Sequence, residues 1–118
     1  RAIGDRAGEG ATLNNISQIY DARGDTDTAL DYLQQSLAIR RAIGDAAGLC
    51  ATLFNMGHIH LQNGQQDEAL GAWLAAYQLA SRIGHAQVLA ALEGLAGQLG
   101  RPGGLAGWAA LARQAGGA

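Results

Sequence analysis

The chain has little cysteine, proline or aromatic content. It contains one cysteine, Cys50, one proline, Pro102, and only 5% aromatic residues in a length of 118. A single cysteine cannot form a disulfide within the chain, so a reducing compartment is compatible and we expect a cytoplasmic location. Runs of Val, Ile and Thr are absent, which argues against β-strands. No apolar run reaches the roughly 18 residues of a membrane span, and no signal peptide is visible.

The charge balance excludes another class of function. Eight basic and ten acidic side chains give a net charge of −2, and the basic residues form no stripe. We therefore expect neither a nucleic-acid partner nor a membrane partner. The hydrophobic content of 48%, carried mainly by Ala and Leu, is too high for a disordered tail and suits close helix packing. Because the sequence opens at a repeat boundary without Met, we expect it to be a piece of a longer protein.

The sequence repeats itself at a fixed interval. Segment 1–5 (Arg-Ala-Ile-Gly-Asp) recurs unchanged at 41–45 and returns in weaker form at 83–85, and Ala-Thr-Leu at 11–13 recurs at 51–53. A fixed period of about 40 residues is typical of proteins built from stacked supersecondary units. It predicts a repeat scaffold rather than a globular catalytic fold.

Each unit has the pattern of two helices. Apolar residues recur at three- and four-residue spacings, as expected for one face of a helix. Gly24, Gly44, Gly64 and Gly84 follow these stretches as helix stops. Side chains after the stops can cap the next helix: Asp25 or Thr26, Asp45 and His85. A looser turn is expected at 100–104, then a short helix, with a fraying end at 116–118.

This pattern resembles the tetratricopeptide repeat. The family signature combines bulky, small, aromatic and glycine positions, which in the first unit hold Leu13, Ile16, Ser17, Tyr20, Gly24, Ala29, Leu33 and Ser36. The same positions in the second unit hold Leu53, Met56, Gly57, His60, Gly64, Ala69, Trp73 and Ala76. The third unit keeps small residues but loses large ones: Glu93, Ala96, Gly97, Gly100, Gly104, Ala109, Arg113 and Gly116. The period, longer than is usual for the family, is similar to that of kinesin light chains, the adaptor Pins and many bacterial regulators.

The resemblance implies an all-α fold, a right-handed α-solenoid of antiparallel helix hairpins. We expect one domain over 1–118, with six helices in about three repeats at about 6–44, 45–84 and, degenerate, 85–116. Ala29, Ala69, Ser17 and Gly57 are interpreted as packing residues where helices cross closely. A larger residue there would cost about 1–3 kcal/mol through overpacking.

The resemblance also implies that the first helix of each unit lines a concave face that binds a protein or peptide segment. The residues expected on this face are Asn14, Asn15, Gln18, Asp21, Phe54, Asn55, His58, Leu61, Gln62 and Gln98. Asn15 and Asn55 are equivalent, and in related arrays such an asparagine holds the ligand backbone; the alternative is a bond to a neighbouring loop. The lining lacks the Lys and Arg needed to grip a terminal carboxylate.

No catalytic, metal or cofactor site is predicted. His58 and His60 lie about 200° apart around a helix, so they cannot chelate one ion together. Cys50 falls near a helix start, where a lowered thiol pKa would allow a reactive thiol, but the pattern gives it no nearby base. We therefore expect a binding scaffold and no enzyme. Two alternatives stay open: self-association through exposed end helices, using Leu105, Trp108 and Leu111, or a regulatory or sensor arm of a larger protein.

Overall fold

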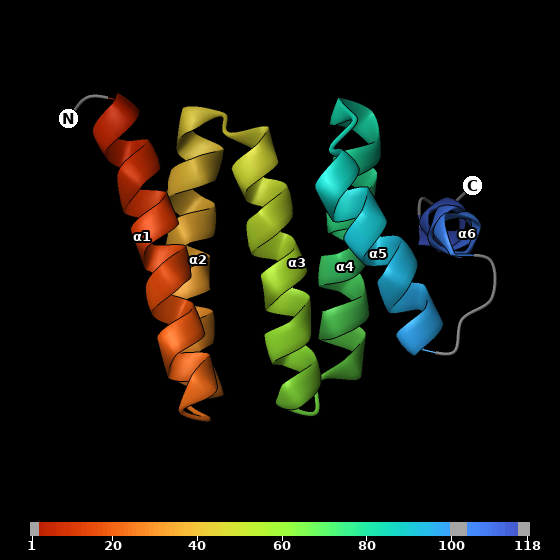
Figure 1. Cartoon of the computed structure of the whole chain (residues 1–118), viewed down its shortest axis with the longest axis horizontal. Coiled ribbons are helices and arrows are strands. Elements are labelled where there is room, and N and C mark those ends of the chain that lie inside the picture. Colours follow the sequence, from red (N-terminus) through yellow and green to blue (C-terminus); the bar gives the residue numbers. More distant parts are fainter. Residues whose placement is uncertain (1–2, 100–103, 116–118) are drawn as a thin grey trace.

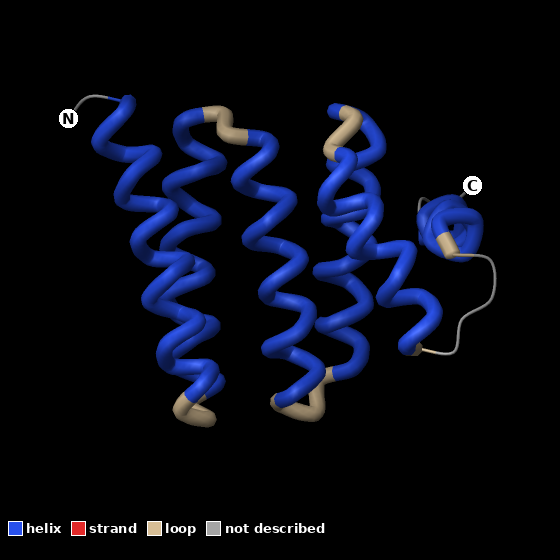
Figure 2. Tube along the Cα trace, in the orientation of Figure 1, coloured by secondary structure: helices blue, strands red, loops and turns tan. Residues whose placement is uncertain are grey.

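The computed structural model describes residues 3–99 and 104–115, and these ranges contain six α-helices and no strand (Figure 2). The helices are α1 (Ile3–Ala22), α2 (Thr26–Ile43), α3 (Ala46–Gln62), α4 (Gln66–Ile83), α5 (Ala86–Gln98) and α6 (Leu105–Ala115). The predicted all-α fold with six helices is therefore confirmed. Within the described ranges, no helix combines the length and the hydropathy that a membrane crossing requires.

Glycines in the left-handed conformation mark the turns at a constant interval along the chain. They are Gly24, Gly44, Gly64, Gly84 and Gly104, with φ between 52° and 82°. A side chain with a Cβ is strained at such angles, so glycine follows the helix end at little cost at the first four of these positions, whereas Gly104 directly precedes α6. The Asp45 carboxylate then accepts a hydrogen bond from the Gly48 N–H at 2.9 Å, and Asp25 caps α2 in the same way. The predicted stops and caps are confirmed.

The first four helices form two similar hairpins. Short turns join α1 to α2 and α3 to α4, and the members of each pair lie side by side (Figure 1). The first helices also adjoin one another, because α1 contacts α3 and α3 contacts α5. Among the described residues, α2 and α4 make no comparable contact. The layer formed by α1, α3 and α5 is therefore the more closely spaced side of the array.

Small side chains lie where the helices of each hairpin meet. Ala29, Ala69 and Ser17 are fully buried. Gly57 on α3 faces Trp73 on α4, and a Cβ at this glycine would collide with the indole ring. These residues hold packing positions, as the signature predicts.

The two joints between successive units have different chemistry. At the first joint, the Arg40 guanidinium donates hydrogen bonds to the Gly48 carbonyl and the Thr52 hydroxyl, both at 2.9 Å. The Asp45 carboxylate lies 3.8 Å from Arg40 Nε. At the second joint, the residues one repeat after Arg40, Gly48 and Thr52 are apolar and buried: Ala80, Val88 and Leu92. The hydrogen bonds of Arg40 with Gly48 and Thr52, which we call the polar staple, are thus replaced by apolar packing at the second joint.

The third unit departs from the first two. α5 ends at Gln98, four residues before the position equivalent to the end of α3. α6 contacts both α4 and α5, and Figure 1 shows it along its own axis while the other helices run across the view. Trp108 anchors it, because the buried indole N–H donates to the Leu92 carbonyl at 2.8 Å. Most of the predicted turn, 100–103, and the predicted frayed end, 116–118, lie outside the described residues.

Candidate binding groove

A polar groove lies between α1 and α3. Its volume is about 360 Å³, and its lining residues are Ser17, Gln18, Asp21, Asn55, His58, Ile59 and Gln62. The three from α1 and the four from α3 recur at three- and four-residue spacings, which places each set on one helix face. Five residues predicted from the sequence therefore meet in this groove, which we call the α1–α3 groove.

One predicted asparagine joins the two units. The Asn55 side chain donates a hydrogen bond to Asn14 Oδ1 at 3.2 Å, across the interface between α3 and α1. Its partner is thus a neighbouring helix rather than the loop considered above. Asn15, the equivalent of Asn55 in the first unit, is exposed on α1. The two equivalent residues therefore have different surroundings.

Asp21 and His58 are the titratable side chains that line the α1–α3 groove. Asp21 Oδ1 is buried, and no described residue donates a hydrogen bond to it. Burial lowers the pKa of His58 below its ordinary value, and the Asp21 charge opposes this shift in part. The imidazole is therefore neutral near pH 7, and the groove carries one carboxylate with an unsatisfied oxygen.

Aromatic side chains connect this groove to the interior of the second unit. The His58 ring packs edge-on against Phe54, with centroids 4.7 Å apart, and against Trp73 at 5.3 Å. The Trp73 indole N–H donates to the Phe54 carbonyl at 3.1 Å. Phe54, expected from the sequence on the binding face, is partly buried and packs against a hydrophobic cluster of the second and third units instead. His58 thus belongs both to the groove and to an aromatic wall behind it.

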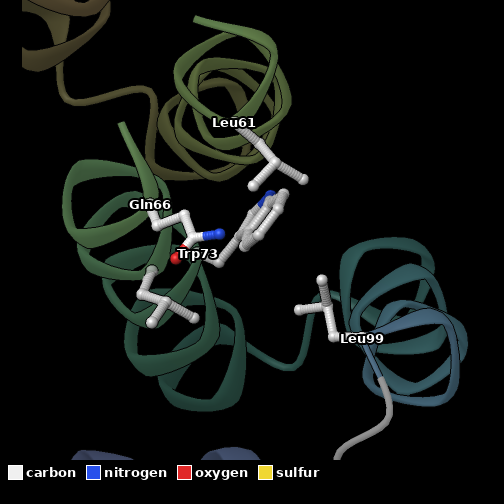
Figure 3. A pocket seen from close by; sticks show the side chains of 5 residues that line it. Leu61, Gln66, Trp73 and Leu99 are labelled. Atoms are coloured by element: carbon white, nitrogen blue, oxygen red, sulfur yellow. The ribbon is translucent and has the colours of Figure 1, made fainter. Parts of the chain in front are cut away.

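A second, smaller hollow lies one unit further along the array. Its volume is about 200 Å³, and it is lined by Leu61, Gln66, Leu70, Trp73 and Leu99. Figure 3 shows Leu61 and the Trp73 indole side by side, with Leu99 facing them from the end of α5. We call it the Leu61 pocket. Gln98, the remaining predicted residue, is exposed near the end of α5 and lines neither hollow.

Several lining residues lie outside the set predicted from the sequence. The pattern assigns Ser17 and Trp73 to the packing signature, and it predicts no binding role for Ile59, Gln66, Leu70 and Leu99. The repeat itself carries a usable signal, because a shift by one unit converts Asp21 into Leu61 and Ile59 into Leu99. The first member of each pair lines the α1–α3 groove, and the second member lines the Leu61 pocket.

The other candidate residues have structural surroundings. His60 Nδ1 lies 2.8 Å from Gln65 Oε1, and His85 caps α5 by accepting from the Val88 N–H. Cys50 is fully buried, and burial raises the pKa of its thiol, which is opposite to the lowered pKa that a reactive thiol at a helix start requires. In residues 3–99 and 104–115, no cluster of three or more His, Cys, Asp or Glu could hold a metal ion.

The α6 face considered for self-association is less exposed than its spacing suggests. Trp108, its largest side chain, is only 1% exposed and therefore offers no surface to a second copy.

Repeated helical hairpins with a polar groove along their first helices define a helical repeat scaffold. The family profile described as tetratricopeptide repeat matches residues 1–42, which span α1 and nearly all of α2. Since α3 and α4 repeat the same hairpin, the second unit has the helical arrangement of the segment that this family profile matches. Repeats of this family are protein–protein interaction modules. Comparisons with curated proteins and with solved structures give no match.

Proposed function

We propose that the chain binds an extended segment of a partner protein along the faces of α1, α3 and α5. The observation that carries this proposal is the α1–α3 groove, an open hollow of about 360 Å³ lined mainly by polar side chains, three of them amides. Amides both donate and accept hydrogen bonds, which suits the alternating N–H and C=O groups of an extended backbone.

The arrangement of the helices supports this choice of face. The first helices of a curved array approach one another on its inner side. Here α1 contacts α3 and α3 contacts α5, whereas the described residues of α2 and α4 make no such contact. Gln18 and Gln62 are exposed at the groove, so their amide groups are accessible to a ligand. The side-chain nitrogen of Asn55 already donates a hydrogen bond to Asn14, so Asn55 would contribute to ligand binding through its side-chain carbonyl oxygen.

The test uses synthetic, degenerate 12-residue peptide pools and a pair of matched variants. Gln18→Ala/Gln62→Ala removes two exposed groove amides, whereas Gln34→Ala/Gln78→Ala removes two exposed amides on α2 and α4. We expect peptide retention on the immobilised wild-type protein, loss of retention with the groove variant, and full retention with the control. All three proteins should show the same helical circular dichroism and melting temperature.

Two results would overturn the proposal. If the groove variant and the control bind alike, ligands do not use this face. If no pool is retained and light scattering shows a concentration-dependent dimer, the chain is a self-association module.

The variant Asn15→Ala tests the asparagine that the resemblance assigns to ligand binding. It should weaken peptide binding, and because Asn15 is exposed it should leave the melting temperature unchanged.

A further inference from the structure

The two hollows share two equivalent positions of successive units, although the second hollow is otherwise lined by α4. Asp21 and Ile59 line the α1–α3 groove, and the residues one repeat later, Leu61 and Leu99, line the Leu61 pocket. The residue on the first helix of each unit therefore changes from the acidic Asp21 in the first hollow to the apolar Leu61 in the second. A segment lying along both would meet two different chemistries in a fixed order.

The first hollow has the features of a site for a cation. Asp21 supplies the carboxylate among its lining residues, and no Arg is among them. The buried Oδ1 of Asp21 lacks a donor among the described residues, which is costly unless a ligand supplies one. Gln18, Gln62 and Asn55 add carbonyl oxygens to the lining. A guanidinium or ammonium group could donate hydrogen bonds to these oxygens. The bond to the Asp21 carboxylate would be the strongest of these hydrogen bonds, because both partners are charged.

The second hollow exists because the array is interrupted. In the first interface Ile59 is almost fully buried and belongs to the cluster that contains Leu30 and Leu33. In the second interface the equivalent residue, Leu99, directly follows the shortened α5 and remains half-buried. An opening of about 200 Å³ is left beside Leu61. Leu61 is 37% exposed, so an aliphatic side chain would remove apolar surface from water there.

We propose that the two hollows recognise one extended peptide by a basic side chain in the α1–α3 groove and an aliphatic side chain in the Leu61 pocket. This inference rests on the proposed function. Packed helices lie about 8–10 Å apart. An extended chain in the polyproline II conformation advances about 3.1 Å per residue and presents every third side chain on the same face, so the two side chains should be about three residues apart.

The test compares defined peptide pools by fluorescence anisotropy. Each fluorescein-labelled 12-residue pool fixes Arg at one position and Leu three residues away, on the C-terminal side in one pool and on the N-terminal side in the other. Reference pools replace Arg by Gln or Leu by Ser, with all other positions degenerate. We expect one of the Arg/Leu pools to bind about tenfold more tightly than either of its references.

Three variants connect this preference to its residues. Asp21→Asn should abolish the preference for Arg and keep that for Leu, and Leu61→Ser should do the opposite. Asp31→Asn removes the same charge from an exposed position on α2 and should change neither. Circular dichroism melting of each variant shows that the hairpins are intact.

The outcomes separate the two proposals. Binding of all pools with equal affinity overturns the basic–aliphatic preference and leaves the peptide groove standing. Arg preference that persists in Asp21→Asn overturns the assignment of the carboxylate. If no pool binds wild-type protein, both proposals fail.

Discussion

The Trp73 indole lies against the backbone of Gly57, and this contact fixes how closely α3 and α4 approach. A Cβ on Gly57 would collide with the Nε1, Cδ1 and Cε2 atoms of the indole, which belongs to a side chain only 1% exposed. The ring is held in place, because its N–H donates to the Phe54 carbonyl and His58 packs edge-on against it. The packing of Trp73 therefore depends on a glycine at position 57.

Gly57→Ala should destabilise the protein although alanine is the better helix former. Overpacking against Trp73 should lower the free energy of unfolding by about 1–3 kcal/mol, measured by urea denaturation. Gly71→Ala on α4 is the control, because no atom lies within 4 Å of a Cβ there and the glycine is exposed. It should raise stability by about 1 kcal/mol. Effects of the same sign in both variants would contradict the packing interpretation.

Arg40→Ala should weaken the joint between the first two units. The change leaves the buried Thr52 hydroxyl without its Arg40 partner and removes the side chain that fills the space beside Gly48. We expect a loss of about 1–3 kcal/mol in the free energy of unfolding. The adjacent, exposed Arg41→Ala should change it by less than about 0.5 kcal/mol. Equal losses would show that the effect comes from the charge of the last helical turn and not from the staple.

Stability should fall as the pH drops below the ordinary His58 pKa. Because burial lowers the pKa of His58 in the folded state, the unfolded chain binds the proton more readily. The contribution of His58 is thus complete above pH ~6.5 and is lost as the pH falls through the lower, folded-state value. An NMR titration of the imidazole should give a midpoint below ~6.5. In Asp21→Asn the midpoint should fall further, since the opposing carboxylate charge is gone; an unchanged midpoint would argue against the proximity of the two groups.

The Cys50 thiol should resist modification in the native protein. It is fully buried and its pKa is raised by that burial, so both access and thiolate formation are limited. Reaction with a thiol reagent should proceed at the rate at which the protein opens, and should become fast in denaturing urea. Rapid labelling under native conditions would indicate that the cluster of α3, α4 and α5 residues around Cys50 opens far more often than its packing implies.

The local features were predictable from the sequence because they depend on neighbouring residues. Gly44 and Asp45 set a turn and a cap within a few residues of each other, and the repeat multiplies that signal. The face of α1 and α3 was predictable for the same reason, because helical spacing places Gln18 with Asp21 and Asn55 with His58. The α1–α3 groove therefore contains residues that the pattern itself groups.

What could not be predicted depends on contacts between distant segments. The bond from Asn55 to Asn14 and the edge-on packing of His58 on Trp73 require the rotation of each helix to be known. The early end of α5 is a second case, because the apolar spacing continues through Leu99 while the helix ends at Gln98. Trp108 belongs here too: its spacing suggests an exposed face, but its indole N–H bonds to Leu92 inside the third unit.

The polar staple at the first joint restricts which hairpin can come next. Arg40 needs the hydroxyl of Thr52 and the bare backbone of Gly48, and the corresponding residues of α5 are Leu92 and Val88. If residues 41–80 were excised, the turns would keep their phase, but the guanidinium would face aliphatic side chains. The side chains at each joint therefore determine which unit can follow, because the polar contacts of the first joint and the apolar contacts of the second cannot replace each other. The units are not interchangeable despite their similar sequences.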